Sequence, residues 1–410
     1  MALRFILALV LLSVAAPAFA QNASQGAART AAVRDGSRLR LGPFYFNPSL
    51  SIDNIGVDDN VFLDSETGEP QSDFVVSMTP RLVTSLPLAS RALMTLSVAP
   101  RVDYYQEFAN ARSVAHSFAG RGEVFLGRLA VFGDAGLQVG RMRPNDEIDT
   151  RPGRRQTSFA VGAGFTPLPK LSFETGVYRS VENYDDDEVF LGTRLSDTLD
   201  HETEGVRLSV RQRLTPKTSI SLEGDLSRSG FAHSPVRDAS SYRIAPGVSF
   251  SLTALIAGSA HVGFRRLVPE SPDLPGSSGL FASVDLSYTL REATRFGLQW
   301  TRDLTYSYER EQPYYLLDAL GGTVRQQVAG RVDAIFGYRQ SVSRYEVLTS
   351  VEQDAPRRDI TRTYSADLGM RINRRSRVGL RYVQSGRRSN QKRFRDYGRR
   401  QIGLSYMYGM

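Results

Sequence analysis

Apolar and polar residues alternate with a period of two along most of this chain. Between residues 206 and 214 the even positions are largely apolar, whereas three of the odd positions are arginine: Val206, Leu208, Val210 and Leu214 against Arg207, Arg211 and Arg213. Successive side chains of a β-strand point to opposite faces, so this period predicts a strand. After a tight turn at 215–217 the pattern resumes at Ile220, which predicts a hairpin with one apolar and one charged face.

The same unit recurs along the chain, and the connections between its strands alternate in length. Short turns are expected near residues 86–88, 127–128, 167–169, 215–217, 253–254, 291–293, 329–330 and 373–375. Long loops are expected at 53–73, 144–155, 185–199, 231–238, 269–278, 346–359 and 389–395, with shorter links near Asn110 and Gln312. This alternation predicts roughly 18 antiparallel strands, within a range of about 16 to 18, with short turns on the periplasmic side and long loops outside.

The charged face excludes a soluble sandwich, because it carries too much charge to be buried, and in lipid a sheet must close to satisfy its edges. The predicted fold is therefore all-β, a transmembrane antiparallel up-and-down β-barrel whose apolar face points outward. Tyrosines near strand ends suit the membrane interface: Tyr104, Tyr242, Tyr288, Tyr364, Tyr406 and Tyr408.

The N-terminus resembles a secretory signal peptide. A charged start with Arg4 precedes an apolar run over 5–12 and an Ala18-Phe19-Ala20 end, and the run is too short to span a bilayer. We expect cleavage after Ala20, a short periplasmic segment over 21–43 and a barrel over 44–410 in the outer membrane of a Gram-negative cell. The chain has no cysteine, which excludes disulfides, thiolate metal sites and a lipoprotein anchor.

The inward register of such a barrel is rich in arginine and also carries acids. The candidate lumen-lining residues are Arg101, Arg121, Arg207, Arg211, Arg213, Arg243, Arg265, Arg331, Arg339, Arg371, Arg377 and Arg381, with Glu223, Asp225, Asp285, Asp333 and Asp367 among the acids. Two interpretations stay open: a solvated wall stabilised by cross-strand ion pairs, or a selective lining for anionic solutes or acidic polymers.

Charged clusters also occur in the predicted loops. Acidic residues gather over 58–69 and 185–188; we interpret them as solvated loops rather than calcium sites, since their spacing matches no defined calcium loop. A basic cluster over 387–400 is predicted at the outer rim, where lipopolysaccharide phosphates or an anionic polymer would meet it. Nucleic acid is excluded as a partner of an exported chain despite the net charge of +8.

Catalysis has little support in the sequence. The four histidines are scattered without metal-ligand spacing, so no cofactor or metal is expected. His201 and His233 lie near predicted strand ends and are the candidates for an outer-membrane hydrolase, but no motif surrounds them. The sequence therefore favours a protein that is not an enzyme.

The start of the predicted barrel carries a family resemblance. An opening strand over 44–52 runs into Asp59-Asn60-Val61-Phe62, which resembles the corresponding element of the Putative beta-barrel porin 2 family over nearly all of the chain after residue 43. The resemblance implies an outer-membrane barrel of a kind often linked with exopolysaccharide or capsule production. It implies outer-membrane lipid, lipopolysaccharide, the barrel-insertion machinery, polysaccharide and periplasmic export components as partners, and it carries over no catalytic residue.

Three functions follow in order of preference. The first is a porin-like conduit for export of polysaccharide or passage of anionic solutes. The second is a non-conducting structural or assembly barrel of a polysaccharide secretion system, and the third is an outer-membrane hydrolase. The chain ends Tyr408-Gly409-Met410 instead of in the usual phenylalanine, and we expect Tyr408 or Met410 to take the place of that terminal aromatic during insertion.

Overall fold

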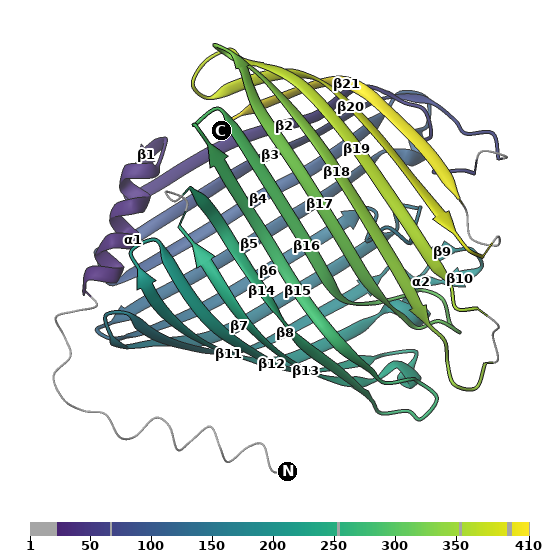
Figure 1. Cartoon of the computed structure of the whole chain (residues 1–410), viewed down its shortest axis with the longest axis horizontal. Helices are drawn as coiled ribbons and strands as arrows, with labels where there is room; N and C mark the ends of the chain where they lie inside the picture. Colours follow the sequence, from purple (N-terminus) through teal and green to yellow (C-terminus); the bar gives the residue numbers. More distant parts are fainter. Residues whose placement is uncertain (1–22, 66–67, 252–254, 352–354, 392–395, 410) are drawn as a thin grey trace.

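The computed structural model describes residues 23–65, 68–251, 255–351, 355–391 and 396–409. Within these ranges the chain forms a closed antiparallel β-barrel of eighteen strands, as the alternation predicts (Figure 1). The expected signal peptide and the expected turn at 253–254 lie outside the described residues.

Each barrel strand pairs with its neighbours in the sequence, and the last strand pairs with the first. The strands are β2 (Phe44–Asp58), β3 (Asp73–Leu88), β4 (Ala92–Tyr105), β5 (Ser113–Leu126), β6 (Leu129–Arg141), β7 (Gly153–Leu168), β8 (Leu171–Tyr184), β11 (His201–Thr215), β12 (Thr218–Phe231), β13 (Ala239–Phe250), β14 (Ile256–Pro269), β15 (Ser277–Leu290), β16 (Thr294–Tyr306), β17 (Tyr314–Ala329), β18 (Val332–Glu346), β19 (Arg358–Arg371), β20 (Ser376–Ser389) and β21 (Tyr397–Tyr408). Pairing of β2 with β21, from Leu50 opposite Tyr408 to Asp58 opposite Gln401, closes the ring.

Apolar side chains cover the outside of the barrel. Phe159, Val161 and Phe336 are 58, 60 and 58% exposed in the isolated chain, a fraction that is costly in water and favourable in lipid. On the opposite register many buried side chains are polar or charged, including Asp333 and Arg377. This inside-out arrangement confirms that the apolar register faces outward. Among the described residues, no helix is long and apolar enough to cross a membrane.

The connections alternate as expected, with corrections at some boundaries. The turn expected at 86–88 is wrong: β3 continues through Leu88, and the turn lies at 89–91, where Ala89 adopts a φ of 55°. Proline is tolerated at position 87 because the pairing of β2 with β3 ends at Ser85, so the missing N–H of Pro87 removes no bond to β2.

The first long loop is also shorter than predicted, because β2 extends to Asp58. A β-bulge between Ile52 and Ile55 carries the strand through this segment, since the extra residue bends the strand without ending its pairing. Asp58 is therefore a buried strand residue and not part of an acidic loop.

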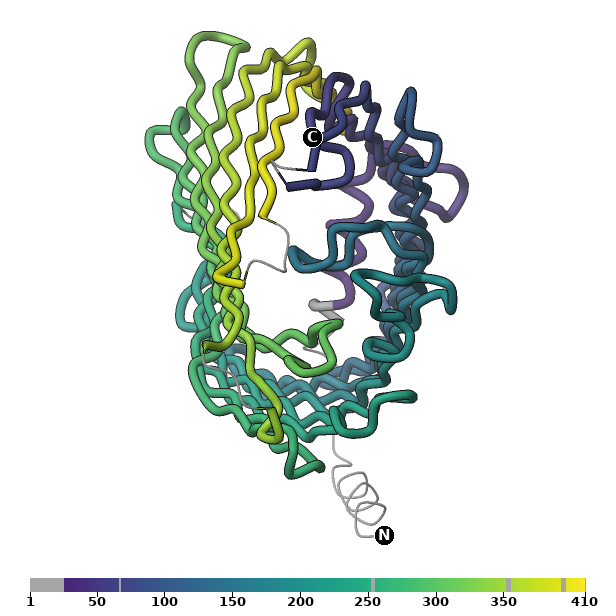
Figure 2. The backbone as a smooth tube through the Cα atoms, turned by 90° about the vertical axis from the view of Figure 1, so that its right-hand side faces the viewer, coloured from purple at the N-terminus to yellow at the C-terminus, as the bar shows by residue number. Residues whose placement is uncertain are grey.

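Short elements occupy both ends of the barrel. At the end with the short turns, α1 (Ala23–Gly36) precedes β1 (Leu39–Leu41), which pairs with the start of β2. Arg29 of α1 forms an ion pair with Glu123 on β5, and α1 crosses behind the lumen in the view of Figure 2. At the loop end lie η1 (Ala109–Ala111), β9 (Val189–Phe190), β10 (Thr193–Arg194), α2 (Leu195–Leu199) and η2 (Pro235–Arg237).

Deleting residues 406–410 should prevent the barrel from assembling. Tyr406 and Tyr408 of β21 pair with Ile52 and Leu50 of β2 and with Val378 and Ser376 of β20, so the deletion leaves backbone groups unpaired in lipid at a cost of several kcal/mol each. The measurement is the heat-dependent gel mobility of membrane-inserted protein, with Tyr408→Phe as the control that keeps the aromatic ring. Normal accumulation of the truncated barrel would contradict the role given to this strand end.

Candidate functional site in the barrel lumen

The predicted lumen residues occupy the register opposite to the exposed apolar side chains, with one exception. Arg331 lies in the turn between β17 and β18, where its guanidinium donates to the carbonyl oxygen of Ile372 at 3.4 Å. The other sixteen alternate with outward residues; Arg207 and Arg211, for example, flank the 50% exposed Leu208.

Several of these residues form cross-strand ion pairs, as the first interpretation expects. Arg377 bonds Asp333 at 2.6 Å and also contacts Asp367. Asp225 lies 3.5 Å from both Arg207 and Arg243. Further contacts join Arg101 to Asp53, Arg121 to Asp134, Arg265 to Asp303 and Glu223 to His261. Much of the inward charge is thus neutralised within the wall.

Other predicted residues have no ion pair among the described residues. Arg211 lies beside Glu174 and His261 in one cavity of the wall, and Arg339 lies with Asp285 and Arg325 in another. Arg213 donates to the carbonyl oxygen of Pro169, and Arg371 ends β19 at the short-turn rim. Arg381 faces a lumen cavity of about 550 Å³.

The segment 142–152 between β6 and β7 extends into the lumen and reaches the far wall. Asp146 accepts a hydrogen bond of 2.8 Å from Ser341 on β18, and β18 is the ninth strand after β7 in an eighteen-strand ring. Figure 2 shows segments of chain inside the ring. The sequence predicts an external loop here; the structure shows a loop across the lumen, which we call the constriction loop.

Arg387 on β20 is the first anchor of the constriction loop. Its guanidinium bonds both carboxylate oxygens of Asp149, at 2.9 and 2.7 Å, and donates to the carbonyl oxygens of Asp146 and Glu147. Both side chains are 2% exposed. A bidentate pair of this kind fixes orientation as well as distance.

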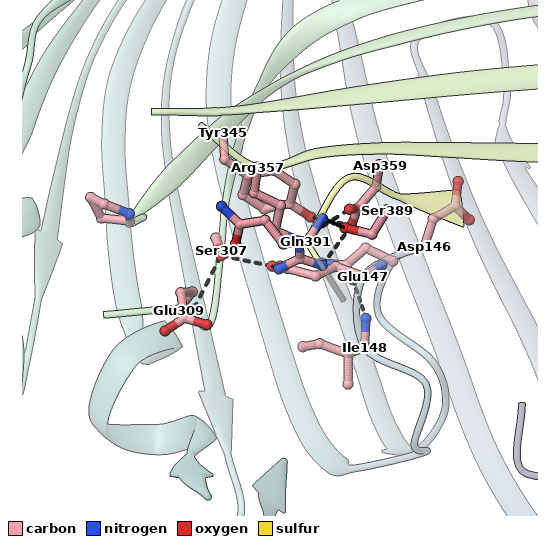
Figure 3. A network of polar contacts seen from close by, with 12 residues as sticks. Asp146, Glu147, Ile148, Ser307, Glu309, Tyr345, Arg357, Asp359, Ser389 and Gln391 are labelled. Atoms are coloured by element: carbon pink, nitrogen blue, oxygen red, sulfur yellow. Dashed lines mark hydrogen bonds and ion pairs between the residues drawn. The ribbon is translucent and has the colours of Figure 1, made fainter. Parts of the chain in front are cut away.

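Arg357, which precedes β19, is the second anchor (Figure 3). It bonds Glu147 at 3.1 Å and Asp359 at 2.5 Å, while Ser307 donates to Glu147 at 2.7 Å. Burial raises the pKa of Glu147, although Arg357 opposes that shift. Burial acts against the charge of Arg357, but Tyr345, Glu147 and Asp359 together raise its pKa above the ordinary value.

An apolar cluster completes the attachment of the loop. Ile148 at its tip is 1% exposed. It packs with Tyr184 at the end of β8 and with Phe190, Leu195, Leu199 and Tyr308 from the neighbouring loops. At the base, Arg143 donates to the carbonyl oxygens of Asp149 and Val61. Burial, with Arg151 and Arg399 nearby, lowers the pKa of Arg143 to about 10. The loop is therefore held on both sides of the lumen.

Beside the constriction loop lies a cavity of about 550 Å³ that is rich in arginine. Its charged lining residues are Arg101, Arg143, Arg151, Arg381, Arg399, Asp53 and Asp103. Five cations thus face two acids. Arg399 also forms an ion pair with buried Asp58, and Arg101 with both acids of the lining. The field at this point of the lumen is positive, since low-dielectric walls focus it.

The predicted basic cluster at the outer rim is partly wrong. Arg387 and Arg399 lie on the inward register and bond Asp149 and Asp58, whereas Arg388 and Arg400 lie on the outward register and are exposed. The strand period of two separates adjacent arginines, so one cluster in the sequence becomes two sites. Lys392, Arg393 and Arg395 lie outside the described residues.

The residues that sequence reasoning missed are Arg143, Glu147, Asp149, Arg151 and Arg357. All lie in loops, where no periodicity indicates direction. For Arg387 and Arg399, a signal was present: continuing the alternation of β20 and β21 by a few residues places both inside. Asp58 likewise follows from extending the register of β2 through its bulge.

The remaining candidates show no assembled site among the described residues. The oxygens of Asp185, Asp187 and Glu188 lie within 4.8 Å of one another, but Glu188 is engaged by Arg141 at 3.0 Å and by the N–H of Gly153 at 2.8 Å. His201 stacks on Phe231 with its Nδ1 2.7 Å from the carbonyl oxygen of Leu199. His233 is exposed in the loop after β12.

Comparison with known protein families identifies the family to which the chain belongs. The family model described as Putative beta-barrel porin 2 matches residues 36–407. The chain belongs to this family. It is thus a porin-like barrel of the outer membrane, as the opening strand suggests. No curated protein matches the sequence.

Solved structures similar to this porin-family barrel include a porin, an outer-membrane protein and an iron transporter. A BenF-like porin from Pseudomonas fluorescens Pf-5 has 11% identity and a TM-score of 0.48, with 89% of this chain and 99% of that chain covered. The outer-membrane protein opdK from Pseudomonas aeruginosa has 10% identity and a TM-score of 0.46, and the match covers 88% of this chain and 98% of that chain. The FrpB iron transporter from Neisseria meningitidis has 10% identity and a TM-score of 0.45, and the match covers 85% of this chain and 63% of that chain.

Proposed function

We propose that this barrel is a diffusion channel for small anionic solutes, with its selective region beside the constriction loop. The observation that carries the proposal is the cavity in which five arginines face two aspartates. Guanidinium groups keep their charge across the physiological pH range and bind carboxylate and phosphate with matching geometry. A positive constriction raises the local concentration of anions and repels cations.

The distribution of ion pairs supports this position for the selective region. Along much of the wall the arginines are paired, as Arg377 is with Asp333 and Asp367, so those stretches contribute little net field. Arg381, in contrast, has no carboxylate within ion-pair distance among the described residues and faces the cavity. The cavity beside the constriction loop therefore carries net positive charge, with Arg381 unpaired within it in the described part of the chain.

Export of an acidic polysaccharide is a second candidate function of the same arginine-lined lumen. An acidic polysaccharide would meet the same arginines, and the family resemblance supports a link with its production. The constriction loop favours small solutes, because buried ion pairs anchor it to the far wall at Arg387 and Arg357. An extended acidic glycan would have to pass beside this loop.

The test is conductance of the purified full-length mature barrel in planar bilayers, combined with uptake into liposomes. We expect discrete open channels and faster entry of a dicarboxylate than of a neutral or cationic solute of the same size. An acidic oligosaccharide series then gives the size limit. Electrically silent barrels that are correctly folded would overturn the proposal and favour the structural role.

A further inference from the structure

The outer wall carries a basic surface that the lumen proposal does not use. Near the loop ends of β18 to β21, five exposed arginines lie on the outward register: Arg344, Arg358, Arg362, Arg388 and Arg400. We call them the outer arginine patch. They come from four adjacent strands and so form one continuous surface.

The register fixes the direction of these side chains. Arg344 follows the 58% exposed Phe336 by eight residues on the same strand, and Arg400 precedes the exposed Ile402 by two. An even separation in a strand keeps two side chains on one face. The patch therefore borders the apolar belt, at its loop end.

Arginines within the patch lie unusually close together. Arg344 is directly opposite Arg358 on the neighbouring strand. Ile360, two residues after Arg358, is opposite Arg388, so Arg358 and Arg388 are diagonal neighbours. Directly opposed like charges destabilise a sheet unless a counter-charge compensates them. Arg344 is 3.9 Å from Asp318, but among the described residues no carboxylate pairs with Arg358, Arg388 or Arg400.

Two exposed arginines elsewhere on the outer wall are neutralised by the chain itself. Arg179 on β8 contacts Glu202 and Glu204 at 2.6 and 3.7 Å. Arg228 on β12 bonds Glu270 through two contacts of 2.7 and 3.0 Å. Arg155 on β7 and Arg266 on β14 are also exposed and form no ion pair among the described residues, but they lie on two strands that are not neighbours. The clustering of such arginines on the β18–β21 side points to an anion supplied from outside the chain.

We propose that the outer arginine patch binds the phosphates of lipopolysaccharide, with the lipid A acyl chains on the apolar belt below. Arginine is suited to this task because its planar fork of donors matches phosphate oxygens. The exposed Leu380, Tyr382 and Ile402 lie on the same strands and face, toward the membrane interior. A phosphate joined to several acyl chains complements both parts of this surface, whereas a free ion uses only one.

The experiment measures lipid retention by the full-length mature barrel in detergent with native mass spectrometry. The probes are rough lipopolysaccharide, the same lipid after removal of its phosphates, and inorganic phosphate. The test variant is Arg344→Gln/Arg358→Gln/Arg388→Gln, and the matched control is Arg179→Gln/Arg228→Gln, which removes outer arginines that are already paired. Heat-dependent gel mobility verifies folding of each variant.

We expect the triple variant to hold rough lipopolysaccharide at least about tenfold more weakly than the wild type, as the loss of charge-assisted bonds implies. The control should bind as the wild type does, and the dephosphorylated lipid should bind the wild type as weakly as the phosphorylated lipid binds the triple variant. Equal retention by the wild type and the triple variant would overturn the proposal, and so would inorganic phosphate binding with no lipid retained. If the triple variant does not fold, Arg358→Gln alone replaces it, since removing one of two opposed arginines should not destabilise the sheet.

Discussion

Replacing Glu147 with glutamine and Asp149 with asparagine is expected to release the constriction loop and widen the pore. Both carboxylates are buried against arginines of the far wall. Removing one partner of a buried ion pair typically costs about 3–5 kcal/mol. Such a loss lowers the ratio of docked to undocked loop by about 10² to 10⁴-fold, since 1.4 kcal/mol corresponds to a factor of ten.

Single-channel recording measures this change directly. The double variant should show a larger unitary conductance and frequent transitions between levels, as the loop leaves and returns to the lumen. Asp186→Asn/Asp187→Asn is the matched control, because it removes two exposed carboxylates from the loop after β8. A double variant with the conductance and noise of the wild type would show that the loop does not limit the current.

The second large effect is expected from reversing charge in the arginine-lined cavity. Arg381→Glu changes the local charge by two units at a position without an ion pair among the described residues. A unit charge at about 4–5 Å in water contributes about 1 kcal/mol, and the reversal acts on anions and cations in opposite directions. The anion-to-cation permeability ratio should therefore fall by at least about tenfold. Adding Arg151→Glu, which also lines the cavity, should lower that ratio further.

The reversal potential in dilute salt detects this shift, because screening weakens the effect at high ionic strength. Arg266→Glu is the control: Arg266 follows the exposed Phe264 by two residues on β14, so it faces away from the lumen. An equal change in permeability ratio for Arg266→Glu and Arg381→Glu would assign the effect to overall charge instead of the cavity.

The wall of this barrel was predictable because a period of two determines the face to which each side chain points. Arg207 and Leu208 are neighbours in sequence, and alternation alone sends one inward and the other into lipid. The strand number followed from the alternation of short and long connections. The prediction failed at Leu86 to Leu88, where a turn was expected at a proline. Pro87 is compatible with the strand because it lies beyond the residues of β3 that pair with β2.

The constriction was not predictable, since its direction depends on contacts between residues far apart in the chain. Asp149 meets Arg387 across 238 positions, and Glu147 meets Arg357 across 210. Nothing local distinguishes an acidic loop that points into water from one that folds into the lumen. Only the closed ring brings β20 and the segment before β19 within reach of this loop.

We propose that net positive charge at the constriction makes this barrel an anion-preferring channel, and the reversal potential of the wild-type protein tests this most directly. The purified full-length barrel is placed in a planar bilayer between dilute and concentrated potassium chloride. A reversal potential of the sign set by chloride is the predicted result. A reversal potential of the sign set by potassium would contradict the account.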